Sequence, residues 1–331
     1  MQKKTLLALT LICLCATVLA QDNNETFLWK IDRIFNLSST KNIDTNYYRL
    51  APCGWMVNIN NNFGTVGITS DIKNVPAQGN THLSAQSQLN YQIGATAGYR
   101  NLILGYSFIH PAGNAKDALM FIAANAWGVE YRKMVSDDFI GTVENSLSGD
   151  LDILRGDIRT EQRYLRAYHV FNPRRFSMTA AGDQRCIQKQ SAGSVLFYSN
   201  FARNILSFQN PQLQARFGGI ESMEFSSAAV GLGYGYNYTP NQGRLLFHLS
   251  AVPMLVAFMG EDFTIGGIVQ QERASHLLLS LIGRFTANYR FNDHLGINLT
   301  AVYNNLGTRT VNDMKTTLND LFIRAALCVR F

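Results

Sequence analysis

Two pairs of serine and histidine residues in the second half of the sequence have spacings that could support nucleophilic chemistry. His248 and Ser250 are two residues apart, and His276 and Ser280 are four residues apart. If both segments are β-strands, each pair shares one face, because strand side chains alternate between two faces. A histidine beside a serine can act as its general base when an asparagine or aspartate orients the ring. The four residues are therefore weak candidates for the catalytic site of a lipid hydrolase.

Other features of the sequence favour a role without catalysis. Barrel phospholipases and lipid A deacylases place their sites at the lipid-facing surface near the outer rim, and the sequence contains no Gly-x-Ser-x-Gly motif. Cys53, Cys186 and Cys328 lack the paired spacing of a zinc site or a disulfide framework. We therefore expect the serine and histidine pairs to be solvated lumen residues. We also expect no catalytic activity, no cofactor and no metal.

Several charged residues share strand faces with runs of asparagine and glutamine. Charges that face lipid would cost about 2–4 kcal/mol each at the bilayer midplane. An inward run of arginine could form an anion-preferring pore. A lumen of about twelve strands can also be filled by side chains, and we favour this plugged interior over an open channel. The residues that we expect to face the lumen are Glu130, Arg132, Arg244, Arg284, Arg324 and Arg330.

The composition leaves two classes of protein. Only 16% of the 331 residues are charged, against about 25% in typical soluble domains. With 20 Phe, 14 Tyr and 26 Gly but 7 Pro, the chain suits strands and tight turns. Beyond the N-terminal segment no stretch of about 18 residues is free of polar interruptions, which argues against transmembrane helices. A membrane β-barrel or an apolar soluble β protein remains, and the net charge of +6 gives no reason to expect nucleic acid as a partner.

The N-terminal residues predict export. Two lysines precede an apolar run from Leu6 to Leu14, and small residues lead to Ala20. This pattern predicts a Sec-type signal peptide at residues 1–20, cleaved after Ala20. Residues 21–50 carry apolar residues at helical spacing and predict a periplasmic amphipathic segment and linker. Residues 51–331 are then expected to form an outer-membrane β-barrel.

Apolar and polar residues alternate along most of this third segment. The alternation is clear from Leu89 to Ala97 and again from Leu321 to Phe331. Strands of about ten residues with one apolar face have the length needed to cross a bilayer. Short turns such as 135–138 and 239–242 alternate with longer segments such as 260–275. This asymmetry between the two sides is typical of outer-membrane barrels.

We predict an all-β fold, an antiparallel up-and-down transmembrane barrel of about twelve strands. An even number is needed if both termini are periplasmic. Polar residues interrupt the segment 175–202, which we interpret as one bent strand or as a strand with an inward excursion. Fourteen strands is the alternative if 203–224 contains another strand. The predicted strands lie near 55–70, 87–98, 101–109, 119–134, 138–146, 163–171, 175–202, 225–238, 243–259, 276–290, 293–304 and 318–331.

Glycine and tyrosine alternate within one predicted strand. Gly231, Gly233 and Gly235 share one face, where they would leave room for a bulky neighbour in the lumen. The other face should join an aromatic girdle at the membrane interface. It carries Tyr234, Tyr236 and Tyr238.

Two blocks of the sequence resemble a known family. One is Asp44-Thr45-Asn46-Tyr47-Tyr48 before the first predicted strand, and the other lies between residues 172 and 194. They are similar to a Bacteroidota family of outer-membrane β-barrels, domain of unknown function 4421, and the resemblance spans roughly residues 25–331. Relatives usually carry an aliphatic residue in place of Tyr48, and a third apolar residue in place of Gly182. The resemblance implies location and architecture but no activity. The matching residues are Asp44, Thr45, Tyr47, Arg175, Phe176, Ser177, Gln188, Ser191, Ala192, Gly193 and Ser194.

The small residues Ser191 to Ser194 should let the chain pack closely inside the barrel, with a ligand contact as the alternative. A final strand that ends on Phe331 resembles the signal read by the barrel-assembly machinery of Gram-negative outer membranes.

We therefore expect a monomeric barrel in the cell outer membrane, surrounded by outer-membrane lipids and assembled by that machinery. It would act as a narrow channel, a ligand carrier or a structural barrel. A barrel lipid hydrolase of the phospholipase or lipid A deacylase type is one alternative. A soluble periplasmic lipid-binding β protein is the other.

Overall fold

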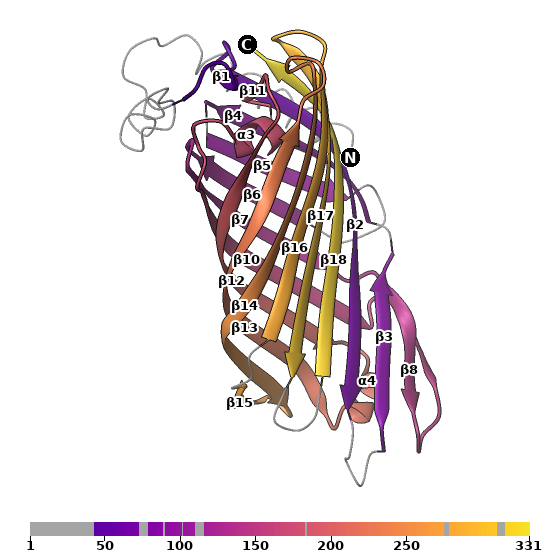
Figure 1. Cartoon of the computed structure of the whole chain (residues 1–331). Coiled ribbons are helices and arrows are strands. Elements are labelled where there is room, and N and C mark those ends of the chain that lie inside the picture. The colour runs from indigo at the N-terminus through magenta and orange to yellow at the C-terminus, as the bar shows by residue number, and fades with distance from the viewer. Residues whose placement is uncertain are drawn as a thin grey trace.

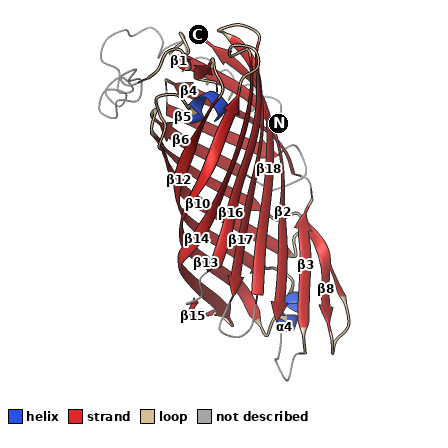
Figure 2. Ribbon diagram, viewed as in Figure 1, coloured by secondary structure: helices blue, strands red, loops and turns tan. Residues whose placement is uncertain are grey.

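The computed structural model describes residues 43–72, 79–88, 90–100, 102–109, 116–182, 184–274, 278–309 and 315–331. Within these ranges strands predominate, and the helices are α3 (Met178–Gly182) and α4 (Pro211–Arg216), shown in Figure 2. Neither of these described helices has the length or apolar character to cross a membrane. The predicted signal peptide, residues 1–20, and residues 21–42 of the predicted periplasmic segment lie outside the described residues.

Strands of the described chain close into one antiparallel barrel (Figure 1). The sheet contains 16 strands, of which β3, β8, β9 and β15 lie off the ring, so twelve remain, and β18 pairs with β2 to close it. The predicted fold class and strand number are confirmed. The ring consists of β2 (Trp55–Ile72), β4 (Asn90–Tyr99), β5 (Leu102–Ile109), β6 (Lys116–Ala123), β7 (Trp127–Ser136), β10 (Ile158–Val170), β12 (Ala192–Phe208), β13 (Ile220–Tyr238), β14 (Leu245–Ile265), β16 (Leu278–Arg290), β17 (Leu295–Arg309) and β18 (Lys315–Arg330).

Two of the predicted strands differ from the observed ones. The segment 119–134 is not one strand but the end of β6 and most of β7, joined by a tight turn in which Ala124 N donates to Trp127 O at 2.8 Å. The segment 138–146 forms β8 (Phe139–Asn145), which pairs with β3 (Thr81–Ser87) and with β9 (Leu151–Ile153) outside the ring. Alternation shows that a segment is extended, but it does not show which strand is its partner.

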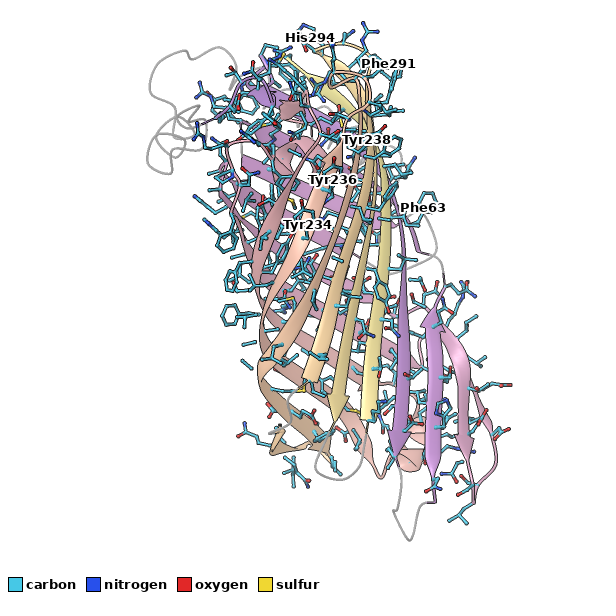
Figure 3. The ribbon with its side chains drawn as sticks, viewed as in Figure 1. Phe63, Tyr234, Tyr236, Tyr238, Phe291 and His294 are labelled. Carbon is cyan, nitrogen blue, oxygen red and sulfur yellow. The ribbon has the colours of Figure 1, made fainter. Side chains whose placement is uncertain are left out.

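Apolar side chains cover the outside of the barrel. On β13 the side chains of Tyr234, Tyr236 and Tyr238 point away from the wall (Figure 3) and are 53%, 43% and 52% exposed. Outward positions from Ala228 to Tyr238 extend about 33 Å along the strand, which at the usual tilt is about 25 Å across a bilayer. Beyond Ala228, the outward-facing residues become charged: Arg203 and Glu224 form an ion pair at the edge of this apolar belt. The chain is therefore a transmembrane β-barrel.

The two ends of the barrel have different connections. Short turns join β4 to β5, β6 to β7, β13 to β14 and β16 to β17 at one end, where α3 and the C-terminus lie (Figure 1); we call this the plug end. The opposite end, the loop end, holds α4, β3 and β8. Segment 135–138 belongs to the loop end, contrary to prediction, because it joins β7 to β8. Predicted loop 260–275 is mostly strand, because β14 continues and pairs with β15 (Ile268–Ala274).

The segment between β10 and β12 folds into the plug end. It contains α3 and the short strand β11 (Cys186–Gln188), which pairs with β1 (Tyr48–Leu50). We call residues 43–50 and 172–191 together the plug. The structure thus supports the second interpretation of 175–202, a strand with an inward excursion. Residues 43–50 pack in the plug rather than acting as a linker into the first wall strand.

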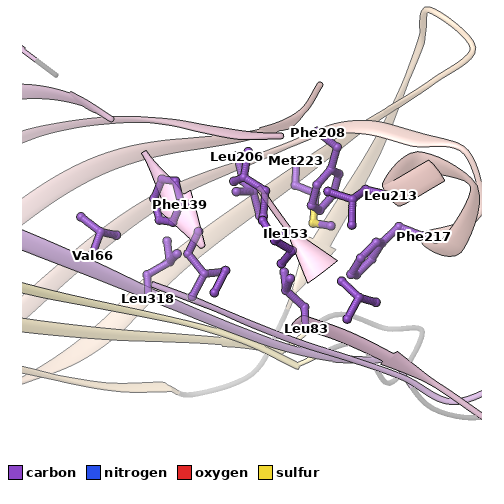
Figure 4. Close-up of a cluster of buried hydrophobic side chains, with 14 of the residues drawn as sticks. Val66, Leu83, Phe139, Ile153, Leu206, Phe208, Leu213, Phe217, Met223 and Leu318 are labelled. Atoms are coloured by element: carbon purple, nitrogen blue, oxygen red, sulfur yellow. The ribbon is translucent and has the colours of Figure 1, made fainter. Parts of the chain in front are cut away.

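Apolar side chains fill the loop end (Figure 4). They come from strands of the ring, from β3, β8 and β9, and from α4. The N-cap of α4 is Asn210, whose side chain accepts from Gln212 N at 2.9 Å. The alternative of a further strand in 203–224 is wrong, because that segment contains the end of β12, α4 and the start of β13. We call this cluster the apolar seal; its residues are Val66, Ile68, Leu83, Ala85, Phe139, Val143, Ile153, Ile158, Leu206, Phe208, Leu213, Phe217, Met223, Phe225, Phe263 and Leu318.

Candidate functional site

Gln188 of β11 is the centre of the plug. Its side chain is 1% exposed and uses both ends of the amide. The Oε1 atom accepts from Ser177 N and from Asn237 Nδ2, each at 3.1 Å. The Nε2 atom donates to Arg175 O at 2.6 Å and to Gln190 O at 3.0 Å. One glutamine therefore ties β11 to the turn before α3 and to wall strand β13.

The first matching block packs on the same turn. Asp44 N donates to Arg174 O at 2.9 Å, and the Arg175 guanidinium lies 4.8 Å from the centre of the Tyr47 ring. Thr45 O accepts from the Lys189 ammonium at 2.8 Å. The two blocks of family resemblance, far apart in sequence, thus meet in the plug.

The residue that departs from the family pattern, Tyr48, is fully buried in this contact. Its hydroxyl donates to Pro173 O at 2.5 Å. Burial raises the pKa of the Tyr48 hydroxyl above its usual value, so the group stays a neutral donor. A tyrosine therefore adds a hydrogen bond here that an aliphatic residue would lack.

The small residues at the start of β12 fix the chain where it leaves the plug. Ser191 Oγ accepts from Thr239 N at 2.9 Å, and Ser194 Oγ accepts from Asn172 N at 2.9 Å. Gly193 O accepts from Asn172 Nδ2 at 3.1 Å, while Ala192 is buried. A side chain at Gly193 would collide with the Tyr234 ring. The hydrogen bonds of this segment are made within the protein, whereas the Tyr234 ring lies on the outer face of the barrel.

Asparagine side chains on the wall hold helix α3. Ser177 caps its start by accepting from Ala180 N at 3.1 Å. Asn288 Nδ2 donates to Ala180 O at 2.8 Å and to Ala181 O at 3.0 Å, and Asn298 Nδ2 donates to Gly182 O at 3.3 Å. The last carbonyls of a helix have no partner within it. Here the barrel wall supplies the donors.

His248 and Ser250 take part in a buried hydrogen-bonded chain behind the plug. His248 Nε2 lies 3.0 Å from Ser250 Oγ, and Nδ1 lies 2.8 Å from Asn237 Oδ1. The histidine is 0% and the serine 5% exposed, and the Phe176 ring of the plug lies 6.0 Å from the imidazole. The expectation of solvated residues is wrong for this pair. The order of the three groups is that of a nucleophile, base and orienting residue, but the plug covers them.

The second pair gives no such arrangement. Ser280 Oγ donates to Asn305 O at 2.5 Å. His276 lies outside the described residues. Within the described ranges, no group of three or more His, Cys, Asp or Glu side chains could hold a metal ion.

Four of the charged residues expected in the lumen line one central cavity of about 80 Å³. Glu130, Arg132, Arg284 and Arg324 face it, and Gly182 at the end of α3 forms part of its wall. Arg284 Nη2 lies 3.4 Å from Glu130 Oε2, although their strands are on opposite sides of the ring. The Arg132 guanidinium lies 3.7 Å from the centre of the Phe322 ring, also across the lumen.

Arg330 and Arg244 lie at the plug end instead. Arg330 is 2% exposed and donates to Gln184 Oε1 at 2.5 Å, so it supports the plug. Arg244 is exposed in the turn before β14, which corrects its predicted place in the lumen. In a turn, side chains do not alternate between the lumen and the outer face, so the alternation along β14 does not determine the direction of Arg244.

Sequence reasoning missed Arg166 on β10. It is 3% exposed, donates from Nη2 to Asn304 Oδ1 at 2.9 Å, and stacks its guanidinium 4.6 Å from the Tyr164 ring centre. Its Nε and Nη1 atoms have no hydrogen-bond partner among the described residues. The signal was present, because Tyr164, Arg166 and Tyr168 alternate with Leu165 and Ala167 in the predicted strand at 163–171.

Phe331 lies at the seam of the ring. Its side chain is 47% exposed, and its backbone exchanges hydrogen bonds with Trp55 at 3.0 and 3.1 Å. The terminal residue therefore completes the pairing of β18 with β2. Recognition of this residue by an assembly machinery stays a prediction.

The sequence matches the family described as Domain of unknown function (DUF4421) over residues 42–331. No curated protein matches it.

Several solved structures align with this chain over most of its length. Outer membrane protease OmpT from Escherichia coli has 8% identity and a TM-score of 0.40, covering 86% of this chain and 98% of that one. The P. putida toluene transporter TodX has 9% identity and a TM-score of 0.30, covering 85% and 91%. Outer membrane protein OprG from Pseudomonas aeruginosa has 15% identity and a TM-score of 0.26, covering 84% and 96%. At these values the fold assignment rests on the strand pairing of the chain itself.

Proposed function

Because the chain belongs to the DUF4421 family and folds as a transmembrane barrel, we propose that it is a plugged outer-membrane barrel that takes a small polar ligand into its lumen. It would act as a gated channel or carrier rather than as an open pore. The observation that supports this most is the central cavity, which is bounded by α3 of the plug on one side and separated from the loop end by the apolar seal.

An open pore is disfavoured by contacts that cross the lumen. Arg284 reaches Glu130, Arg166 reaches Asn304, and Arg132 reaches Phe322, in each case between strands on opposite sides of the ring. A solute would have to displace these side chains as well as the plug. Passage therefore requires a change of conformation.

A purely structural barrel is disfavoured by the way the plug is held. Its contacts with the wall combine apolar packing with amide hydrogen bonds from residues such as Asn237, Asn288 and Asn298. Each such bond adds only about 1 kcal/mol net, because water can replace it. Moving the plug would also expose Phe176 and Met178, which pack against apolar side chains of the wall.

We assign the plug end to the periplasm, because short turns face the periplasm in outer-membrane barrels. The outward apolar belt would contact outer-membrane lipids, and the protein would be a monomer assembled by the barrel-assembly machinery. Fractionation separates this proposal from a soluble periplasmic protein. We expect the protein in the membrane fraction with heat-modifiable gel migration, and recovery as a soluble protein would contradict the assignment.

Planar-bilayer conductance of the full refolded chain tests whether the plug acts as a gate that blocks the lumen. Wild type should show little steady conductance, and Gln188→Ala should raise it several-fold, because the change removes the contacts that centre on that amide. Gln190→Ala is the matched control, since Gln190 is exposed and two residues away. Asn288→Ala serves as a second plug variant, and heat-modifiable migration checks that each variant folds. Steady conductance in wild type, or closed Gln188→Ala and Asn288→Ala barrels, would contradict the proposal.

A lipid hydrolase is the second candidate, supported by the chain Ser250–His248–Asn237. Catalysis would require the plug to move, because these groups are covered by it. Lipid turnover in detergent should then be abolished in Ser250→Ala and retained in Ser280→Ala, whose hydroxyl binds a backbone carbonyl instead. No turnover in the wild type or in Gln188→Ala would end this candidate.

A further inference from the structure

A second inner cavity, of about 60 Å³, lies between the central cavity and the apolar seal. It shares Tyr164 with the central cavity and Leu318 with the apolar seal. Among the described residues, its charged side chains are one of each sign, Arg166 and Asp320. We call it the amide cavity, because its lining includes the carboxamides of Gln162, Asn200, Asn204, Asn304 and Asn305.

Two facing residues of this cavity have unsatisfied hydrogen-bonding atoms. Arg166 is 3% exposed and donates from Nη2 to Asn304 Oδ1, but its Nε and Nη1 have no partner among the described residues. Asn200 lies directly opposite Arg166 in the pairing of β10 with β12, and its buried Oδ1 likewise has no partner in the described chain. Buried polar groups are normally hydrogen-bonded, because leaving one unsatisfied costs its desolvation. Two donors and one acceptor thus remain open to a ligand.

The combination of donors and an acceptor selects the chemistry of that ligand. A hydroxyl group can accept from the Arg166 guanidinium and donate to Asn200 Oδ1 at the same time. A carboxylate can only accept, so it would leave Asn200 Oδ1 unsatisfied. An ammonium group can only donate, and it would be repelled by the guanidinium. The facing pair therefore favours a neutral hydroxyl group.

The other side of the amide cavity is apolar, with Ala202, Ala229, Ile282 and Leu318 in its lining. A buried water molecule needs two to four polar partners, which it would not find beside these side chains. The volume of about 60 Å³ is several times the roughly 10–15 Å³ that one water needs. A molecule with hydroxyl groups on a short carbon chain would match both sides of the cavity.

We propose that the amide cavity binds a small neutral polyol, one hydroxyl of which bridges Arg166 and Asn200 while its carbon chain lies against Ala229 and Ile282. The inference rests on the proposed function, because the polyol reaches the cavity only when the plug moves. It adds the chemical class of the small polar ligand.

Calorimetric titration of the full refolded barrel with erythritol tests the site, in wild type and in Gln188→Ala, where the plug is loosened. Erythritol, a small polyol, should bind, whereas succinate, an anion of similar length, should not, because its carboxylates cannot donate to Asn200 Oδ1. Asn200→Ala should weaken erythritol binding about fivefold and Arg166→Met at least about tenfold, because a bond to a charged group is the stronger one. The matched controls, Asn319→Ala and Arg163→Met, change side chains outside the cavity and should leave binding unchanged.

A cavity-filling variant tests the location without changing these polar groups. Ala229→Leu places hydrocarbon in the amide cavity, so erythritol binding should be lost while heat-modifiable migration is retained. Ala228→Leu is its control, because the neighbouring side chain is on the outer face.

No erythritol binding in either wild type or Gln188→Ala would show that the cavity holds water only, and would overturn the inference. Equal binding of succinate, unchanged binding in Ala229→Leu, or equal losses in Arg166→Met and Arg163→Met would overturn it as well. The proposed gate would survive these outcomes if Gln188→Ala still opened the barrel in the bilayer, so the two failures are distinguishable.

Discussion

At the plug end the lumen is closed by amide and hydroxyl groups together with a few apolar side chains such as Phe176 and Met178, whereas at the loop end it is closed by a larger set of packed apolar side chains. Gln188 illustrates the first closure, with hydrogen bonds to Tyr47, to the turn at 175–177 and to β13. Phe208 illustrates the second, being 2% exposed and stacked on Phe217 with 4.8 Å between ring centres. Water can replace hydrogen bonds at low net cost but cannot replace apolar packing. We therefore expect the plug to open more readily than the apolar seal.

Breaking the apolar seal should have the largest effect. Phe208→Ala removes a buried ring and leaves a cavity, so we expect a loss of about 3–5 kcal/mol in the free energy of unfolding. Urea unfolding in detergent, followed by gel mobility, measures it. The control is Phe201→Ala on the same strand, whose side chain is 58% exposed on the outer face and leaves no cavity. Equal losses in the two variants would show that the cluster is not a packed core.

Overpacking the plug should have a smaller and local effect. A methyl group at Gly235 would lie 2.9 Å from Leu196 Cδ1 and 3.1 Å from Phe176 Cζ, which packs in the plug. Gly235→Ala should therefore cost about 1–2 kcal/mol and make residues 172–191 more susceptible to protease than in wild type. Gly283→Ala is the control, because its added methyl would meet only Tyr303 Cβ at 3.9 Å. Equal protease resistance of Gly235→Ala and Gly283→Ala would argue against tight packing between plug and wall.

The barrel itself could be predicted from the sequence because its signals are local. Alternation places Tyr234 outside and Asn237 inside without knowledge of any partner strand. The polar residues around Gln188 likewise indicated that 175–202 was not an ordinary wall strand. Gly235 leaves room for bulky neighbours, as expected of this glycine face, since Phe176 and His248 occupy the space beside it.

The remaining features depend on contacts between distant segments. The turn between β6 and β7 lacks glycine and proline and carries only Asn125 as a turn-forming residue, so the local signal that divides the run from 119 to 134 is weak. The partner of His248 is Asn237, which lies opposite it only because of the register between β13 and β14. The pairing of β1 with β11 joins residues more than a hundred positions apart. The sequence pattern within either segment does not indicate which strand it pairs with.

Hydrogen–deuterium exchange of the folded barrel tests the difference between the two closures most directly. Amides exchange through local opening, at a rate that reports the stability of each segment. We predict that amides of α3 and β11 exchange much faster than those of β12 beside Leu206 and Phe208, in conditions where the barrel stays folded on a gel. Equally slow exchange in both places would show that the plug is a fixed part of the wall, and would contradict the proposed gate.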